Sequence, residues 1–453
     1  MAEGALESYL RRLDRGLDRA LPAINRRATM ASRVRRSFSM RRCADMIGVS
    51  YAYLTKAAAQ MPGFPEGKHV GRERVFTLDE LMRIRALLAA SAKKPHEMLA
   101  WRKPGDPLPV ISFASQKGGT GKSLSAAHFA QYLSLRYGMR VGLIDADPQH
   151  TLTLYFLRDS GTGEGGGAVS AETPTLVDFA GLYANGEIPY TEHDAATLDS
   201  FFIGTPWPGI RILPASGETS EGELQIARLI RAAPRGKRFY RYVGDALDRW
   251  KDAHPAVTDP ASLTDGAGTI DEAAYGAALT ETFDAIVIDY QPALTIFQLN
   301  NLLATTHLVI PQTMKGFDLA TLSTFVKGML GMIEEILARD PLEIGPGTHM
   351  LLPTIVQRAN DQDLAQIGSL MEEAPGLVLP VFYMRSDAVA NAADMYQSAY
   401  EFDPTPGQRR GLARFVENAD AVNDAIVSRI WPGMERGMAQ AWIDKMYAEE
   451  EDS

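Results

Sequence analysis

A glycine-rich segment that carries two lysines has the composition of a phosphate-binding loop. It reads Lys117-Gly118-Gly119-Thr120-Gly121-Lys122-Ser123 and lies between an apolar strand pattern, Pro109–Ala114, and a helical pattern. Glycines at such a junction let backbone N–H groups and the helix N-terminus approach a phosphate chain. Lys122 would then reach the β- and γ-phosphates, and the Ser123 hydroxyl would bind Mg²⁺. The spacing therefore predicts a site for a nucleoside triphosphate.

This segment departs from the ordinary phosphate-binding loop in two ways. Gln116 stands where the ordinary pattern has glycine, and Lys117 is an additional lysine. With these changes the segment resembles the deviant Walker A motif of the ParA/MinD class of ATPases. The resemblance implies that the nucleotide is ATP with Mg²⁺ and that Lys117 reaches across a dimer to the nucleotide of the other subunit. It also implies a set of nucleotide-binding residues, which are Gln116, Lys117, Gly118, Gly119, Thr120, Gly121, Lys122, Ser123 and, at the adenine, Asn360.

Three aspartates follow apolar strand patterns and so fall beside the predicted loop. Asp145 and Asp147 come after Val141–Ile144, and Asp289 comes after Ala285–Ile288. An apolar strand that ends in an acid is the Walker B layout, in which Asp289 holds Mg²⁺. The Asp-x-Asp-Pro-Gln run resembles the switch segment of the ParA family, which implies that Asp147 positions the attacking water and Asp145 supports the Mg²⁺ shell. After Asp289 the family has Cys-Pro-Pro, whereas this chain has Tyr-Gln-Pro-Ala.

The surrounding patterns predict an α/β fold with a mostly parallel, doubly wound sheet, as in P-loop NTPases. Apolar runs alternate with helical patterns, which is typical of βαβ units whose sheet is covered on both faces. Composition agrees, because 45% of the residues are hydrophobic and 23% are charged. The single cysteine, Cys43, excludes a disulfide or a cysteine-ligated iron–sulfur cluster within one chain. The predicted strands after Pro109–Ala114 are Val141–Ile144, Ala285–Ile288, Leu308–Ile310 and Met350–Leu352.

The first part of the chain is basic, although the formal net charge is −10. Residues 1–110 contain 21 Lys and Arg against 11 Asp and Glu, which leaves 25 basic and 45 acidic residues in the remainder. A basic head on an acidic body favours contact between the head and a polyanion. Residues 38–90 read as two short helices around Gly48, a basic ribbon and a third helix, which resembles a winged helix-turn-helix of the MerR type. A lysine- and proline-rich stretch, Ala92–Pro109, has the composition of a linker.

The winged helix-turn-helix layout places candidate DNA contacts. Base contacts would come from Tyr51, Tyr53 and Lys56 in the second helix, and phosphate contacts from Arg72 and Arg74 in the wing. For either tyrosine, packing inside the head is an equal alternative. Additional candidates for a nonspecific DNA surface are Arg385, Arg409, Arg410 and Arg414.

Leucines at positions 6, 10, 13, 17 and 21 form one apolar stripe on a predicted helix. The stripe packs either on its own domain or on a second copy of the chain, and the sequence leaves both open. We predict three segments: an N-terminal helical dimerisation segment (1–36), a winged helix-turn-helix DNA-binding domain (37–105) and a ParA-type P-loop ATPase domain (106–453), with 251–281 as an insertion.

With its basic head and leading helix, the chain resembles the longer ParA proteins of plasmid partition loci that carry a helix-turn-helix, including the RepA members of replication–partition operons. It implies a weak Mg²⁺-dependent ATPase, stimulated by DNA and a ParB/RepB-like centromere-binding protein, that acts as a homodimer, segregates plasmid or chromosomal DNA and represses its own operon. Cytoplasmic, nucleoid-associated localisation without a membrane follows. The alternative is a nucleotide-sensing transcriptional repressor without a segregation role. A MinD-like membrane ATPase is disfavoured because the last residues are acidic, and an anionic bilayer repels them.

Overall fold

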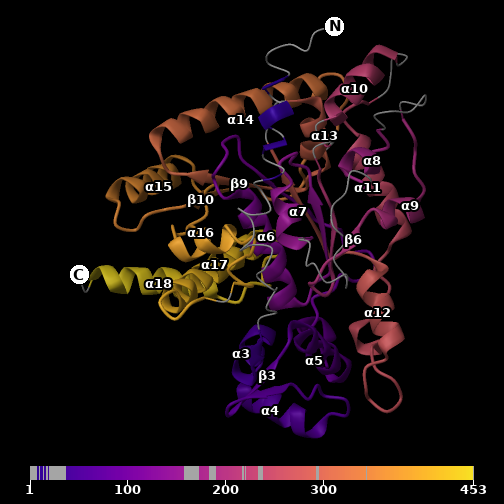
Figure 1. Cartoon of the computed structure of the whole chain (residues 1–453), viewed down its shortest axis with the longest axis vertical. Coiled ribbons are helices and arrows are strands. Elements are labelled where there is room, and N and C mark those ends of the chain that lie inside the picture. The colour runs from indigo at the N-terminus through magenta and orange to yellow at the C-terminus, as the bar shows by residue number, and fades with distance from the viewer. Residues whose placement is uncertain are drawn as a thin grey trace.

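The computed structural model describes residues 37–157, 173–182, 190–216, 219, 221–232, 238–291, 295–342, 344–402 and 404–451, with 8–9, 11–13, 15–16 and 19 of the N-terminal segment. Three features of the sequence lie outside the described residues: most of the leucine stripe, the glycine-rich stretch 161–167 and Pro292–Ala293. Figure 1 shows the whole chain.

Within the described residues, seven strands form the central sheet, in the spatial order β10-β9-β4-β8-β5-β7-β6. Neighbouring strands are parallel except for β6, which pairs with β7 antiparallel. The predicted mostly parallel α/β sheet is therefore confirmed. The strands are β4 (Val110–Ala114), β5 (Val141–Asp145), β6 (Ile203–Gly204), β7 (Ile210–Leu213), β8 (Ala285–Tyr290), β9 (His307–Thr313) and β10 (Met350–Thr354).

Helices connect these strands and cover the sheet (Figure 1). The first of them, α6, starts at the phosphate loop and continues into a π-helical turn, Leu133–Tyr137. The helices of this part are α6 (Lys122–Tyr132), α7 (Thr151–Phe156), α8 (Leu176–Phe179), α9 (Ala195–Ser200), α10 (Glu221–Ala232), α11 (Tyr242–Ala253), α12 (Glu272–Glu281), α13 (Ile296–Ala304), α14 (Gly316–Leu337), α15 (Asp361–Glu373), α16 (Asp387–Ala393), α17 (Arg409–Ile430) and α18 (Met438–Glu451).

Alternating strand residues enter two different cores, which shows that both faces of the sheet are covered. Phe113 and Val287 pack in one apolar cluster with residues of α6 and α17. Ile286 and Ile288 pack in another cluster with residues of α11 and α13. Strands that are buried on both faces need apolar side chains at every position, and this explains the continuous apolar runs in the sequence.

The head contains three helices and a small antiparallel sheet in the order β1-β3-β2. Ser39 and Ser50 cap the first two helices, and Gly48 ends the first one at a φ of 86°, a conformation that glycine adopts without strain. Thr77 and Glu80 form a capping box at the start of the third helix. The elements are β1 (Phe38–Ser39), α3 (Met40–Ile47), α4 (Tyr51–Gln60), β2 (Lys68–Val70), β3 (Glu73–Phe76) and α5 (Leu78–Ser91).

The stretch that we predicted to be a linker is packed against the sheet domain. Trp101 is buried, and its indole N–H donates to the Gly138 carbonyl at 2.8 Å. Arg102 donates to the Phe283 carbonyl at 2.8 Å, and its backbone N–H donates to Asp284 Oδ1 at 2.7 Å. These buried contacts replace the exposed chain that the lysine and proline content suggested.

Buried arginines join the head to the sheet domain. Arg85 of α5 is fully buried and donates to the carbonyls of Met46 in the head and Leu135 in the π-helical turn. From the other side, Arg136 of that turn pairs with Asp45 of α3 at 3.0 Å. Because unpaired charges are costly inside a protein, these contacts fix how the head sits on the helix that starts at the phosphate loop.

The predicted insertion 251–281 packs along the head as well. It contains the end of α11, a 3-10 turn at Pro260–Ser262, a bridge between Thr264 and Ile270, and α12. Its Tyr275 is buried with Leu99 and Trp101, and its Glu272 pairs with Arg83 of α5. Figure 1 shows α12 beside α5 at the end of the molecule that carries the head.

Candidate nucleotide site

The glycine loop connects β4 to α6 in a form that only glycine adopts readily. Gly119 and Gly121 have φ values of 78° and 81°, in the left-handed region. A Cβ added at Gly118, Gly119 or Gly121 would meet nothing within 4 Å, so the loop surface is open to a ligand. Thr354 at the end of β10 donates to the Thr120 carbonyl at 2.7 Å and so holds the loop in place.

Lys122, the first residue of α6, lies between two of the predicted aspartates. Its ammonium donates to Asp289 Oδ1 at 2.6 Å and to Asp147 Oδ2 at 3.0 Å. Burial alone would lower the pKa of Lys122. The negative charges of Asp289 and Asp147 outweigh this effect, so the pKa of Lys122 is raised. The structure thus brings the loop and two acidic strand ends together at one cation, as their positions in the sequence predicted.

Asp289 has an oxygen left over for a further ligand. Its Oδ1 accepts from Lys122, whereas its buried Oδ2 has no hydrogen-bond partner in the described residues. Burial raises the pKa of Asp289, and the charge of Lys122 opposes that rise. An unpartnered carboxylate oxygen beside the Ser123 hydroxyl fits Mg²⁺, which prefers oxygen ligands and completes its shell with substrate phosphates and water. In the described residues no group of three or more His, Cys, Asp or Glu could hold a metal, so such a shell would depend on the nucleotide.

Asp145 pairs in register with Asp289 but directs its carboxylate elsewhere. Its Oδ2 accepts from the Thr153 backbone N–H at 2.8 Å and from the Thr153 hydroxyl at 2.7 Å, and its Oδ1 accepts from the Asp147 N–H at 3.1 Å. Burial, and then the charge of Asp289, raise the pKa of Asp145 to about 7. Both oxygens therefore serve to position the segment that carries Asp147, a role that the sequence did not indicate.

Lys117 is bound within its own chain. Its ammonium donates to Asp318 Oδ1 of α14 at 2.5 Å, and the Thr313 hydroxyl donates to the other oxygen of Asp318. Burial would raise the pKa of Asp318, but the hydrogen bonds from Lys117 and Thr313 outweigh it and hold the pKa below its ordinary value. No sequence motif pointed to Asp318, which lies about 200 residues after the loop.

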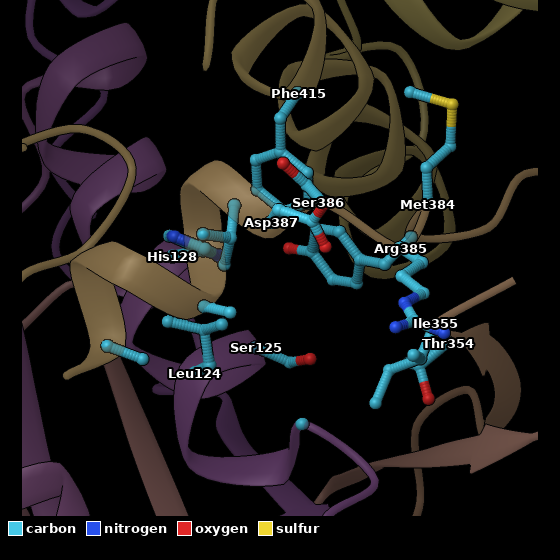
Figure 2. A pocket seen from close by; sticks show the side chains of 15 residues that line it. Leu124, Ser125, His128, Thr354, Ile355, Met384, Arg385, Ser386, Asp387 and Phe415 are labelled. Carbon is cyan, nitrogen blue, oxygen red and sulfur yellow. The ribbon is translucent and has the colours of Figure 1, made fainter. Parts of the chain in front are cut away.

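A cavity of about 270 Å³ extends from Gly121 between α6, β10 and α16 (Figure 2). Leu124, Ser125 and His128 line it from α6, and Phe415 lines it from α17. An adjoining hollow of about 420 Å³ is lined in part by three arginines, Arg358, Arg385 and Arg414. A mostly apolar cavity with a few polar groups at the end of a phosphate loop is suited to a nucleoside.

Asn360, the residue expected at the adenine, does not line the cavity. It is the N-cap of α15, where its side chain accepts from the Gln362 N–H at 3.1 Å and donates to Asp363 at 3.0 Å. Helical spacing from Lys122 could have indicated Ser125 and His128. The segment Tyr383–Asp387, which lines the other side of the cavity, belongs to none of the named strands and gives no periodic signal.

The candidate DNA contacts of the head lie mostly on its surface. Tyr51, Tyr53 and Lys56 are exposed on α4, and Arg72 is exposed in the turn between β2 and β3. Arg74 instead donates to the carbonyls of Glu66 and Pro65 at 2.6 and 2.7 Å, so it braces the ribbon. Of the other candidates, Arg409 and Arg410 are exposed at the start of α17, whereas Arg385 and Arg414 adjoin the cavity.

A family of nucleotide-binding domains, described as CobQ/CobB/MinD/ParA, matches residues 111–395. A putative replication protein A of Rhizobium rhizogenes is 25% identical over 396 residues, which cover 87% of each chain. Protein SopA of Escherichia coli K12 is 23% identical over 335 residues, which cover 70% of this chain and 69% of SopA. A solved structure of a partition protein covers 84% of this chain and 93% of its own, with a TM-score of 0.55 and 18% identity. At that identity the likeness concerns the fold.

No described helix combines the length and the apolar character needed to cross a bilayer.

Proposed function

Because this chain belongs to the CobQ/CobB/MinD/ParA family of nucleotide-binding domains, we propose that it is a DNA-binding partition ATPase. In this proposal ATP binding and hydrolysis serve the segregation of plasmid or chromosomal DNA. One observation carries the ATPase assignment. Lys122, which directly follows the glycine loop, lies within hydrogen-bond distance of both Asp147 and Asp289. A chromosome partitioning protein ParA of Caulobacter vibrioides, 28% identical over 222 residues that cover 49% of this chain, supports the segregation role, as does the relative named as a putative replication protein A.

Different groups at the loop would bind different parts of ATP. Backbone N–H groups of Gly118–Gly121 would bind phosphate oxygens, and Lys122 would exchange a carboxylate partner for a phosphate. Ser123 and Asp289 would hold Mg²⁺, which, when bound, neutralises phosphate charge. Asp147 would orient the attacking water, and Asp145 would position Asp147 through its backbone N–H. The nucleoside would enter the cavity beside Gly121.

The assembly that we propose is a homodimer in which Lys117 of one subunit acts on the nucleotide of the other. Partner and DNA would then stimulate turnover by favouring the arrangement in which this lysine is engaged. Phosphoryl transfer needs positioned charge more than covalent chemistry, so the placement of one lysine can govern the rate.

For DNA, we propose a winged helix-turn-helix domain (37–105) between a dimerisation segment (1–36) and the ATPase domain (106–453). Tyr51, Tyr53 and Lys56 on the exposed face of α4 would read an operator, and Arg72 would contact a phosphate. This domain would repress the protein's own operon. Arg409 and Arg410 would contribute to nonspecific binding of nucleoid DNA, and a ParB/RepB-like protein would connect the ATPase to a centromere.

The alternative is a repressor that senses nucleotide and has no segregation role. The exposed basic and aromatic side chains of the head support DNA binding in either case, so the ATPase cycle separates the two proposals. The test is the Mg²⁺-dependent ATPase rate of the full chain, measured with and without DNA and the product of the adjacent gene, together with plasmid retention in cells that lack the protein. We expect stimulated turnover and lost retention. Operator binding with neither effect would favour the repressor.

A further inference from the structure

Two buried polar groups in the wall of the cavity beside Gly121 have no partner. In the part of the chain that the structure describes, the buried polar side chains that line this cavity are those of Ser125, His128, Thr354 and Tyr383. The hydroxyls of Thr354 and Tyr383 donate to oxygens elsewhere in the protein, at 2.7 and 3.0 Å. The Ser125 hydroxyl and the Nδ1 atom of His128 have no hydrogen-bond partner among the described residues. Because buried polar groups are normally paired, these two are available to a ligand in the cavity.

Ser125 and His128 lie on one face of α6. They are three positions apart, so their side chains are neighbours on the helix surface. Both are almost completely buried, with 3% and 1% of the residue exposed. Figure 2 shows the Ser125 hydroxyl pointing into the cavity. A hydroxyl can accept one hydrogen bond while it donates another, so this group can receive an N–H of a ligand.

The other hydrogen bond of His128 determines what its Nδ1 can do. Nε2 accepts from the Ala399 N–H at 3.0 Å, so the hydrogen of the neutral ring lies on Nδ1. Burial lowers the pKa of His128 to about 3, which keeps the ring neutral. The ring packs against the rings of Tyr383, Tyr400 and Phe415 at centroid distances of 6.0, 5.6 and 5.7 Å. His128 therefore presents an N–H donor in a fixed orientation.

The position of His128 along α6 indicates which part of a nucleotide reaches it. His128 lies seven positions after Gly121, which is about 10 Å along a helix. If the phosphates bind at the glycine loop, the sugar follows and the base lies beyond it, with the edge farthest from the sugar deepest in the cavity. In adenine that edge carries the acceptor N1 and the donor amino group at N6. In guanine it carries the donor N1–H and the acceptor O6.

We propose that Ser125 and His128 select adenine. The His128 Nδ1–H donates to N1 of the base, and the N6 amino group donates to the Ser125 hydroxyl. The inference rests on the proposed function, in which the nucleoside enters this cavity, and it names the residues that choose the base. Guanine would place its N1–H against the N–H of His128, so two buried donors would face each other without an acceptor. A site that hydrogen-bonds its substrate rejects an analogue that leaves the polar groups of the site unpaired.

The first test needs only the natural full chain. Dissociation constants are measured with Mg²⁺ by competition against an ATP analogue whose fluorophore is attached to the ribose. GTP should bind about 100-fold more weakly than ATP or worse, and 1-deaza-ATP, which lacks the N1 acceptor, about tenfold more weakly or worse. 7-Deaza-ATP should bind within about threefold of ATP, because N7 is not used. Equal affinities for ATP and 1-deaza-ATP would overturn the assigned bond from His128.

Two variants assign the selectivity to the named side chains. Ser125→Ala should bind ATP about tenfold more weakly and no better than purine riboside triphosphate, which lacks the amino group. His128→Phe keeps an aromatic ring without the N–H donor, so it should bind ATP and 1-deaza-ATP alike. Ser134→Ala is the matched control, because it removes a buried serine hydroxyl that has no partner and lies outside the cavity. Inorganic tripolyphosphate should bind equally to all of these chains, since the glycine loop is unchanged.

The outcomes separate this inference from the proposed function. If the natural chain binds neither ATP nor any of the analogues, the nucleotide site itself is refuted. If it binds ATP and GTP equally well, the site stands and only the selection of adenine is overturned. Selectivity that persists unchanged in Ser125→Ala would also overturn it, because the base would then be recognised by other groups. If His128→Phe does not fold, the analogue series with the natural chain and Ser125→Ala decide the question.

Discussion

Asp318 holds Lys117 from inside the protein, with 2.5 Å between Oδ1 and Nζ. The aspartate side chain is only 2% exposed, whereas the lysine side chain is 44% exposed. The Asp318 carboxylate is therefore fixed inside the protein, whereas the Lys117 side chain that it binds remains accessible. Lys117 can act on the nucleotide of a second subunit only after its ammonium leaves Asp318. The ion pair with Asp318 therefore competes with the proposed action across the dimer.

Replacing Lys117 should separate binding from turnover. Lys117→Ala should bind ATP within about threefold of the natural chain, because Lys122 and the loop amides remain. Turnover should fall by about 100-fold or more, since a charge supplied across an interface is worth about 10³–10⁵ in related phosphoryl transfers. Steady-state ATPase assays and titration with a fluorescent ATP analogue measure the two quantities. Lys94→Ala, which removes an exposed lysine that pairs with Glu97, is the control. Hydrolysis at the natural rate in Lys117→Ala would refute the role across the dimer.

Removing Lys122 should cost stability as well as nucleotide binding. Lys122→Ala leaves the buried Asp289 without its cation, and breaking a buried ion pair costs about 3–5 kcal/mol. The free energy of unfolding in urea should fall accordingly. Lys122→Ala with Asp289→Asn should recover part of that stability, because the fully buried residue 289 then carries no charge, although Asp147 still lacks its cation. Neither variant should bind ATP. Equal stability of the natural chain and Lys122→Ala would show that the pair contributes nothing to folding.

Acid should destabilise the protein partly through His128. Its Nε2 accepts from the Ala399 N–H at 3.0 Å, and burial lowers its pKa to about 3. The unfolded chain binds this proton near pH 6.5 and the folded chain does not. The contribution of His128 to stability is therefore complete above pH 6.5 and is lost as the pH falls toward 3, by about 2 kcal/mol at pH 5.

His128→Gln keeps an acceptor near the Ala399 N–H but does not titrate, so its stability should fall less between pH 7 and 5. Urea unfolding at several pH values measures the difference. His69→Gln, at an exposed position of β2, should follow the natural chain. Parallel pH profiles for the natural chain and His128→Gln would contradict this origin of acid sensitivity.

The sequence predicted the elements that depend on local pattern and missed those that depend on distant contacts. The sequence allowed us to predict that Lys122, Asp147 and Asp289 lie close together, because the carboxyl ends of parallel strands meet at one edge of the sheet. Asp318 could not be found in this way, because only the packing of α14 brings it to Lys117. Composition was misleading at Trp101, because lysines and prolines flank this residue in the sequence although its side chain is buried.

Deleting the head should therefore damage the whole protein. The sequence predicted a DNA-binding domain (37–105) separate from the ATPase domain, but Arg85, Trp101 and Arg102 bind carbonyls of the sheet domain. We expect the truncated chain to unfold several degrees lower or to aggregate. Replacement of Tyr51, Tyr53 and Lys56 by alanine should instead remove operator binding and preserve the ATPase rate, because all three are exposed. Footprinting and thermal unfolding measure these effects; a fully active, stable truncation would show that the buried contacts are dispensable.

The cavity beside Gly121 can be tested by filling it. Ala393 of α16 lines the cavity, and Ala393→Phe would occupy the space assigned to the nucleoside. ATP affinity should fall by about tenfold or more, whereas inorganic tripolyphosphate should bind as before, because the glycine loop and Lys122 are unchanged. Asn391→Phe, on the same helix but exposed and outside the cavity, is the matched control. Competition titrations against a fluorescent ATP analogue distinguish the two ligands. If Ala393→Phe bound ATP as tightly as the natural chain, the nucleoside would have to lie elsewhere, and the adjoining hollow lined by Arg358, Arg385 and Arg414 would be the next place to test.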